Sequence, residues 1–398
     1  MLGRIFFTIS LASLCFSVEA ATPLVLKPEV LKKVNQLVKG EDKDAAEAYK
    51  QLVKSADKAL KQPLLSVMDK EVIPPSGDKH DYMSIAPYWF PNPDTEDGLP
   101  YVRKDGVRNP EVDNFVDKLN MPRMIKNVET LALAYYFTGE RAYAKKAADF
   151  VRVWFLNVET KMNPNLNYAQ AIKGRNDGRG AGLIETRHFI RLLDAVNLIS
   201  DSKKDWTQKD DKELQDWFRE FLGWMQTSEI GKHEMRAKNN HGVFYDAQRL
   251  AYAMYVGENN LAKEAIENAK GRLDIQMNDE GAFPEELERT IGVHYSVFVL
   301  NAFVTIADMS DKMNVDFWSY ESPTGKSLKK GITWIAPYIG QEKEWPYQQI
   351  KPFNYEDAEV MMRQAAKKLK EPKFEKIAEK VKSTNPSLLR MVQIVSAD

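Results

Sequence analysis

A repeated helical hairpin in the middle of the chain is the feature that most limits the possible folds. The segment Leu131–Ala148 holds an apolar helical stretch, a Gly139-Glu140 corner and a second helical stretch. The segment Leu250–Ile266 repeats this order around a Gly257-Glu258 corner. Repeated helical hairpins tend to stack side by side, burying their apolar faces against one another. The repeat therefore predicts an all-α fold, an (α/α) toroid or barrel that need not be complete, with an open solenoid as the alternative.

Helical periodicity dominates the rest of the chain, and strand-like alternation is scarce. Helices are expected over residues 45–60, 124–137, 142–155, 183–199, 210–225, 262–275 and 297–309. The exception is Val72–Pro110, which contains seven prolines and several aromatic residues. A stretch of this kind inside a compact domain is more often a functional loop than a spacer. The pattern after Trp334 is still helical, so we predict one domain over residues 21–398.

The first twenty residues have the pattern of a signal peptide. Arg4 precedes an apolar run from Ile5 to Phe16, and Val18-Glu19-Ala20 follows, with cleavage expected after Ala20. The run is shorter than the roughly 20 residues that a bilayer requires. We therefore predict a periplasmic or secreted protein with no membrane span. The single cysteine, Cys15, lies in this leader, which would leave the mature chain without disulfides or cysteine metal sites.

The net charge and the spacing of the histidines limit which ligands and cofactors are expected. The formal net charge is −1, which argues against a nucleic-acid partner. A local basic cleft for a polyanion is still compatible with this total, because a ligand responds to the field where it docks. No HExxH or similar spacing occurs among the histidines His188, His233, His241 and His294. We therefore predict no metal site and no required cofactor.

Two polar stretches beside glycines are candidates for binding and catalysis. Lys173–Arg187 places Arg175 and Arg179 among four glycines ahead of a predicted helix. This is either a cationic loop for an anion or a corner with solvated charges, and the sequence does not decide between them. Lys238–Asp246 places His241 after two amides and before a glycine. The backbone can then approach a ligand while the His241 ring presents a nitrogen to it.

A third polar stretch, Gly281–Ser296, combines acids with an arginine and a tyrosine. If a helix begins near Glu285, Arg289 and Tyr295 lie six residues apart and close to one face of it. His294 lies one position round from Tyr295. By default a helical tyrosine is half-buried packing, so Tyr295 has either that role or a chemical one.

Together, these residue types suit β-elimination from a uronic-acid polymer. The proton on C5 is poorly acidic because the adjacent carboxylate opposes a carbanion. Asn, Arg and His donors can neutralise that carboxylate where charge develops. A tyrosine whose pKa is lowered by neighbouring Arg and His can serve as base, acid or both. The set needs no metal.

The motifs, taken in order, resemble the alginate lyase superfamily with a helical toroid fold, nearest to polysaccharide lyase family 38. The resemblance rests on the segments Tyr82–Pro93, Gly178–Arg187, Asn239–Asp246 and Glu285–Ser296. It implies a polysaccharide lyase that cleaves alginate, with Tyr295 as base and acid. It also implies that His241 assists as neutraliser or second base, while Asn240 and Arg289 hold the carboxylate.

The resemblance further implies residues that line the sugar subsites. These are His80, Tyr82, Trp89, Arg175 and Arg179. Asn239 and His294 flank the catalytic candidates and are also expected to contact substrate. The sequence does not decide which of Asn239 and Asn240 faces the carboxylate.

Other functions remain open at this stage. Helical lyases of this kind also act on glucuronan and other uronates, so the motifs do not fix the sugar. A glycoside hydrolase on the same toroid would use two carboxylates, drawn from Asp177, Glu185, Glu285, Glu286 and Glu288. A non-catalytic sugar-binding protein would use aromatic side chains such as Tyr88, Trp89 and Phe90. Elimination leaves an unsaturated, ultraviolet-absorbing sugar, and hydrolysis or binding does not.

Overall fold

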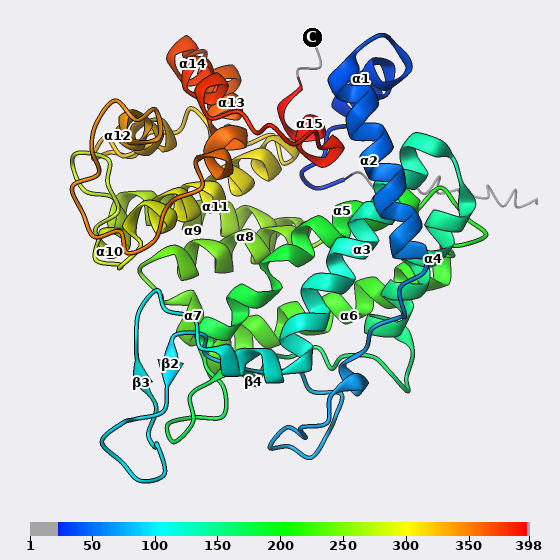
Figure 1. The fold of residues 1–398 in the computed structure, drawn as a ribbon, viewed down its shortest axis with the longest axis vertical. Helices are drawn as coiled ribbons and strands as arrows, with labels where there is room; N and C mark the ends of the chain where they lie inside the picture. The colour runs from blue at the N-terminus through cyan, green and yellow to red at the C-terminus, as the bar shows by residue number, and fades with distance from the viewer. Residues whose placement is uncertain (1–22, 396–398) are drawn as a thin grey trace, which may run out of the picture.

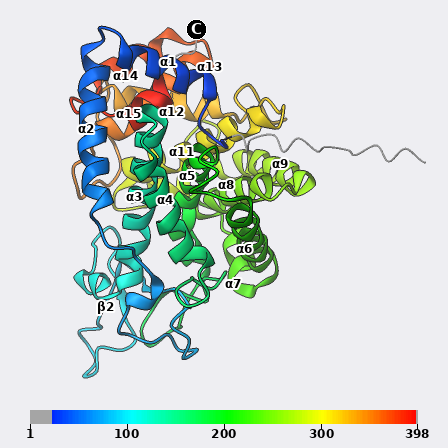
Figure 2. The same ribbon diagram turned by 90° about the vertical axis from the view of Figure 1, so that its right-hand side faces the viewer.

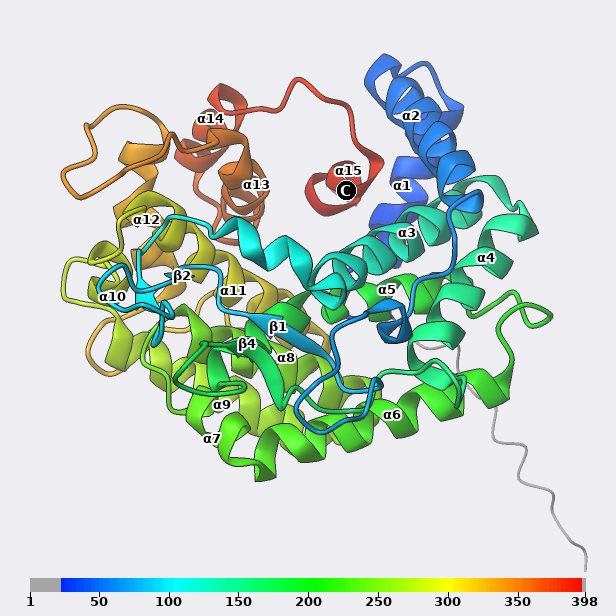
Figure 3. The ribbon, with the colours of Figure 1, turned by 60° about the horizontal axis from the view of Figure 1, so that its bottom comes forward.

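The computed structural model describes residues 23–395, and the expected signal peptide lies outside these residues. The described chain is mostly helical (Figure 1), and its helices are arranged around a ring (Figure 3). The α-helices are α1 (Pro28–Lys39), α2 (Lys43–Leu60), α3 (Val116–Thr138), α4 (Arg141–Val151), α5 (Phe189–Ile199), α6 (Gln208–Thr227), α7 (Glu229–Met235), α8 (Asn240–Tyr255), α9 (Asn259–Gln276), α10 (Pro284–Leu287), α11 (Gly292–Lys312), α12 (Leu328–Ile339), α13 (Glu359–Lys368), α14 (Pro372–Lys380) and α15 (Leu388–Ile394).

The predicted repeat is confirmed as two helical hairpins. Helices α3 and α4 form the first, and α8 and α9 the second. Gly139 and Gly257 occupy the two corners with φ of 75° and 80°, a left-handed conformation that glycine adopts without steric cost. The sequence pattern therefore reports both the helices and the turns that reverse them.

The other predicted helices are present, with two local departures. The stretch 142–155 ends in a π-helical turn over Arg152–Leu156. The stretch 183–199 begins as a 3-10 helix over Gly180–His188, called η4, before α5 starts. Other short 3-10 turns occupy Val67–Asp69, Pro110–Asn114 and Tyr355–Ala358.

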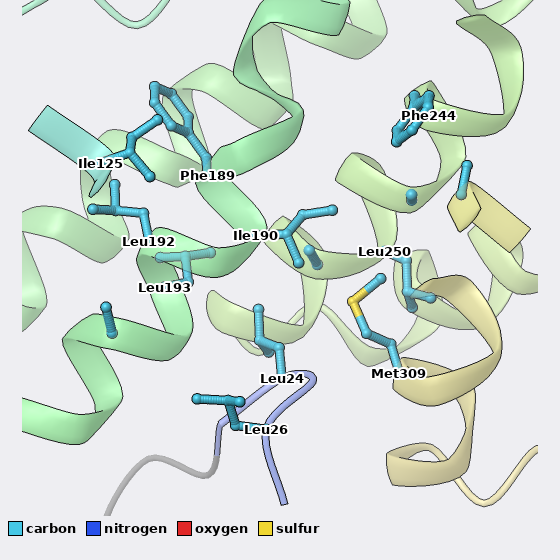
Figure 4. Packing of buried hydrophobic residues seen from close by; sticks show 14 of the residues in the cluster. Leu24, Leu26, Ile125, Phe189, Ile190, Leu192, Leu193, Phe244, Leu250 and Met309 are labelled. Atoms are coloured by element: carbon cyan, nitrogen blue, oxygen red, sulfur yellow. The ribbon is translucent and has the colours of Figure 1, made fainter. Parts of the chain in front are cut away.

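The last helix closes the ring. Helix α15 lies between α13 on one side and the α1–α2 hairpin on the other (Figure 3), and it contacts all three. Buried apolar residues from Leu24 to Val392 form one continuous cluster. Figure 4 shows part of it, in which Leu24 and Leu26 belong to the same cluster as Leu193 and Met309. The predicted toroid is confirmed.

Helix α11 runs through this core. Among the described residues it is the one helix long and apolar enough to cross a membrane by length and composition, and 72% of that window is buried inside the protein. Burial of this kind is typical of a central helix in a folded domain.

The proline-rich segment forms short strands at one end of the ring. Strand β1 (Met83–Ile85) pairs in parallel with β4 (Tyr168–Ala171), and β2 (Trp89–Phe90) pairs antiparallel with β3 (Val102–Arg103). Figure 2 shows the β2 region and the connecting loops gathered beyond the ends of the helices. This end of the ring carries the residues that the sequence analysis singled out.

Candidate active site

A cleft of about 440 Å³ opens at the loop end of the ring. The loop after β1, helix α3, η4, the start of α8 and the link between α10 and α11 all contribute to its walls. The predicted catalytic residues Asn240, His241, Arg289 and Tyr295 all line it. A second cavity, of about 510 Å³ beside α15, contains none of them, so the smaller cleft is the candidate site.

Tyr295 and Arg289 lie in direct contact at the cleft wall. Nη2 of Arg289 donates to the Tyr295 hydroxyl at 2.8 Å, and the guanidinium lies 3.6 Å from the centroid of the Tyr295 ring. The Tyr295 hydroxyl donates in turn to the hydroxyl of Tyr88 at 3.1 Å. Tyr88 comes from the proline-rich segment, so this segment is part of the site.

The two residues do not share one helix, and that expectation was wrong. Helix α10 ends at Leu287 and α11 begins at Gly292, which leaves Arg289 in the link between them. A distant segment holds the link in place: the Gly292 amide donates to the carbonyl of Gln348, and the Ile350 amide donates to the carbonyl of Thr290. The break between α10 and α11 thus brings Arg289 into contact with Tyr295.

Asp105 also holds Arg289 in place. The Asp105 carboxylate accepts from Nη2 of Arg289 at 2.6 Å and from Nε at 3.0 Å, and it also accepts from the Thr290 amide at 3.1 Å. Burial raises the pKa of Asp105, but these hydrogen bonds outweigh burial and bring its pKa below the ordinary value. Asp105 is therefore ionised at neutral pH and pairs with Arg289.

The expected lowering of the Tyr295 pKa was also wrong. Burial raises the pKa of the Tyr295 hydroxyl above its ordinary value of 10.0, and the charge of Arg289 offsets only part of this. Desolvation outweighs the single cation because the phenolate would sit in a partly dry wall. Tyr295 therefore carries its proton at neutral pH in the free protein.

His241 has a carboxylate partner that the sequence analysis missed. Nδ1 of His241 lies 2.6 Å from Oε1 of Glu234 in α7. The Glu234 side chain is 3% exposed and that of His241 is 21% exposed. Asn239 caps α8, its Oδ1 accepting from the His241 amide at 3.1 Å, so the helix start itself orients the histidine.

Asn240 is held by a second buried carboxylate. Its backbone amide donates to Oε1 of Glu286 at 2.6 Å, and its Nδ2 lies 3.1 and 2.9 Å from the two carboxylate oxygens. Its Oδ1 is buried with no hydrogen-bond partner among the described residues. Burial raises the pKa of Glu286, although the hydrogen bonds from Asn240 act the other way. Glu286 thus fixes the orientation of the Asn240 amide.

Three of the seven predicted substrate-binding residues line the cleft: Asn239, Arg179 and Trp89. Arg175 is exposed outside the lining, where its guanidinium lies 5.1 Å from the Trp89 ring. Its Nε donates to the carbonyl of Tyr101 at 3.1 Å.

The remaining three are engaged elsewhere. Tyr82 is fully buried, and its hydroxyl donates to Glu185 at 2.6 Å. Nδ1 of His80 contacts the carbonyl of Lys161 at 2.6 Å, and Nδ1 of His294 contacts Nε2 of Gln349 at 2.8 Å. None of the three is among the cleft residues.

Several residues of the cleft lining were not predicted as catalytic or substrate-binding residues of a lyase, although Tyr88 was named as a residue that could bind sugar in a non-catalytic protein. These are Tyr88, Arg103, Lys118, Arg187 and Glu234. Arg187 lies in the motif Gly178–Arg187, whereas Lys118 lies in the regular helix α3, where no local sequence pattern marks it as a site residue. Arg187 donates to the Ile184 carbonyl at 2.8 Å and lies over the Phe298 ring. Neither Arg187 nor Arg179 forms an ion pair with a carboxylate among the described residues.

The carboxylates proposed for a hydrolase do not line the cleft. Glu185 accepts hydrogen bonds from Tyr82, Ser84 and Lys118 beneath the cleft wall, and Glu286 is occupied by Asn240. The rest, Asp177, Glu285 and Glu288, are exposed. In residues 23–395 the one carboxylate in the lining is Glu234.

Comparisons with known proteins identify the family of the chain. The sequence profile of the alginate lyase family matches residues 66–345. The structure of an alginate lyase from Bacteroides ovatus aligns with a TM-score of 0.90 and 40% identity, covering 94% of this chain and 100% of that chain. No curated protein matches the chain.

More distant structures share the fold alone. Alginate lyase A1-III complexed with a tetrasaccharide aligns with a TM-score of 0.55 and 14% identity, over 86% of this chain and 89% of that one. The structure of A1-III from Sphingomonas species A1 gives 0.53 and 13% over the same shares. On the extent of the family match and the identity to the Bacteroides ovatus enzyme, this chain belongs to the alginate lyase family and is a polysaccharide lyase.

Proposed function

We propose that this enzyme cleaves alginate by β-elimination, with His241 as the base and Tyr295 as the acid. The observation that carries the proposal is the Tyr295 hydroxyl held at 2.8 Å by Arg289 in a cleft that also contains His241. The Bacteroides ovatus relative is an alginate lyase, which makes alginate the first substrate to test.

The charges of the cleft suit a uronate chain. Five cationic side chains line it: Arg103, Lys118, Arg179, Arg187 and Arg289. Arg179 and Arg187 are half-buried, and a guanidinium partly removed from water without a carboxylate partner is costly. A bound carboxylate would relieve that cost. Guanidinium groups also bind carboxylates through two parallel hydrogen bonds. We infer that these two arginines bind sugar carboxylates.

In the proposed reaction, the substrate carboxylate next to C5 lies against Arg289 and the side-chain amide of Asn239, because the amide nitrogen of Asn240 is already engaged by Glu286. His241 removes the C5 proton, and the electron pair of the C5–H bond forms the C4–C5 double bond. The C4–O bond breaks, and Tyr295 donates its proton to the leaving oxygen. Donors placed where negative charge develops on the carboxylate lower the barrier because they are already oriented.

The protonation state of Tyr295 supports this division of roles. Its pKa is raised by burial, and an anionic substrate beside it would raise the pKa further. A neutral tyrosine is ready to donate a proton but must be ionised before it can accept one. A histidine whose Nδ1 is occupied by Glu234 supplies the acceptor.

A glycoside hydrolase is disfavoured by the absence of a carboxylate pair from the cleft lining in the described part of the chain. Hydrolysis of a glycosidic bond with two carboxylates requires them to flank the bond at roughly 5–9.5 Å from each other. Among the described residues, Glu234 is the single carboxylate in the cleft lining, and its Oε1 is engaged by His241. The described lining thus lacks the second carboxylate of such a pair.

The direct test is ultraviolet absorbance over time with polymannuronate, polyguluronate and glucuronan as separate substrates. A rise with either alginate polymer supports the proposal, and a rise with glucuronan alone would replace alginate by another uronate. New reducing ends without absorbance would overturn elimination in favour of hydrolysis.

A further inference from the structure

A buried carboxylate determines the state of the His241 ring. Glu234 is 2% exposed, and its Oε1 lies 2.6 Å from Nδ1 of His241. Two acceptors at this distance would repel each other, so Nδ1 carries a hydrogen and donates it to the carboxylate. The neutral imidazole then has its lone pair on Nε2, the other ring nitrogen.

We propose that Glu234 is a positioning residue that makes His241 the proton acceptor of the elimination. This inference rests on the proposed function. The Nδ1 hydrogen bond fixes the ring orientation and leaves Nε2 able to take the C5 proton. The Glu234 carboxylate then stabilises the imidazolium that forms, as an acid behind a histidine does in other proton-transfer sites.

The surroundings of Glu234 favour this role over a structural one. Among residues 23–395, the Glu234 side chain forms its hydrogen bond and its ion pair with His241 alone. Burying a carboxylate with so few partners costs stability. Its place behind a cleft histidine is therefore better explained by the chemistry of that histidine than by the fold.

Other charged groups face the His241–Glu234 pair from neighbouring elements. Arg179, ahead of η4, lies near enough to Glu234 to interact with it electrostatically, and Glu286 of α10 does the same with His241. Arg289 and Tyr295 complete the surrounding wall. These groups are unchanged when Glu234 alone is replaced, so the effect of the substitution is assignable to its carboxylate.

The first test is the pH profile of Glu234→Gln. The variant keeps the side-chain size and an acceptor oxygen but loses the charge that stabilises the imidazolium. We expect kcat to fall by about 10²-fold, within the range for a proton-transfer residue, with little change in KM. The acidic limb of kcat/KM should move to lower pH. Glu229→Gln on the same helix, where the side chain is 84% exposed, is the matched control and should leave both unchanged.

A conservative variant and a check of the fold complete this test. Glu234→Asp restores the charge at a longer reach and should recover part of kcat and of the acidic limb. Circular dichroism and Tm of each variant show whether the fold is retained. A folded Glu234→Gln enzyme with the wild-type kcat and acidic limb would overturn the inference, while elimination by the wild type still upheld the proposed function.

A second test needs no substrate and no Glu234 variant. Long-range ¹H–¹⁵N spectra of the histidine rings report which nitrogen carries hydrogen, and His241→Gln assigns the signal. We expect the Nδ1–H form for His241 in the neutral state. The Nε2–H form would contradict the inference whatever the kinetics of the variants.

Discussion

Asp105 and Arg289 join the proline-rich segment to the cleft wall that contains Tyr295. The Asp105 carboxylate accepts from Nε and Nη2 of Arg289, and the same Nη2 donates to Tyr295. One guanidinium thus links a strand-bearing loop, the helix break and the tyrosine. The loop supplies Tyr88 and Trp89 to the cleft, so its placement and the placement of Arg289 are coupled.

Replacing Asp105 with Ala should weaken this coupling. Without its partner, Arg289 loses the geometry in which it contacts Tyr295, and the loop loses an anchor. We expect kcat/KM to fall about 10- to 100-fold, in line with the 2 kcal/mol or so attributed to a charged hydrogen bond. Steady-state kinetics measure this, with Asp316→Ala as the control, because Asp316 is an exposed acid that is not among the cleft residues. Equal kinetics for both variants would mean that Arg289 positions itself without Asp105.

Replacing Tyr295 with Phe removes one hydroxyl and should stop proton donation. We expect kcat to fall about 10²- to 10⁴-fold, the span typical of a lost acid or base, with the fold intact. The ultraviolet assay measures the loss, and circular dichroism checks the fold. Tyr347→Phe, at a residue 39% exposed, should have no effect. Near-normal turnover by Tyr295→Phe would remove this residue from the mechanism.

The pH dependence at high pH separates an acid role for Tyr295 from a base role. The pKa of Tyr295 is raised by burial, and an acid is active in the protonated form. Activity should therefore persist as pH rises toward 10, the ordinary tyrosine value, and be lost above it. Were Tyr295 the base, kcat/KM would instead climb steadily with pH across this range. The profile of kcat/KM from neutral pH upward distinguishes the two.

Replacing Arg187 with Gln should weaken substrate binding more than chemistry. Arg187 has no carboxylate partner among the described residues, so a uronate would supply the missing charge. We expect KM to rise about 10-fold, consistent with one charged hydrogen bond, and the salt dependence of KM to become weaker. Arg219→Gln on the exposed side of α6, where the arginine pairs with Asp216, is the control. An unchanged KM in Arg187→Gln would place the sugar elsewhere.

Replacing Asp194 with Ala should lower the stability of the fold without touching the cleft. Its carboxylate accepts from the backbone amides of Leu24, Val25 and Leu26, which fastens the first described residues to α5. Loss of this acceptor leaves buried amides unpaired, at about 1–3 kcal/mol each. Urea unfolding should show the drop, with kcat of the folded variant unchanged. Unfolding at the wild-type midpoint would show that water replaces the carboxylate.

The helices and the segments that carry the site residues were predicted well from local sequence patterns. The hairpins around Gly139 and Gly257 could be predicted because helix periodicity and a corner glycine are properties of neighbouring residues. The four catalytic candidates meet in one cleft because each lies at or just before a helix start, and in a toroid these starts gather at one end.

The departures come from contacts between distant residues. The break before α11 depends on pairing of Thr290 and Gly292 with Gln348 and Ile350, which no local pattern reports. Tyr82 lies in an aromatic stretch whose Tyr88 and Trp89 line the cleft, yet it turns inward because the buried Glu185 accepts its hydroxyl. The pKa of Tyr295 depends on burial, and burial is known only from the fold.

The place of α15 bears on how this protein folds. Among the described residues, α1 is the first helix in the sequence and α15 is the last, yet the two pack against each other across the seam of the ring. The flank of the α1–α2 hairpin that faces α15 has no partner until the α15 segment is present. The ring therefore cannot be completed by the early part of the sequence alone.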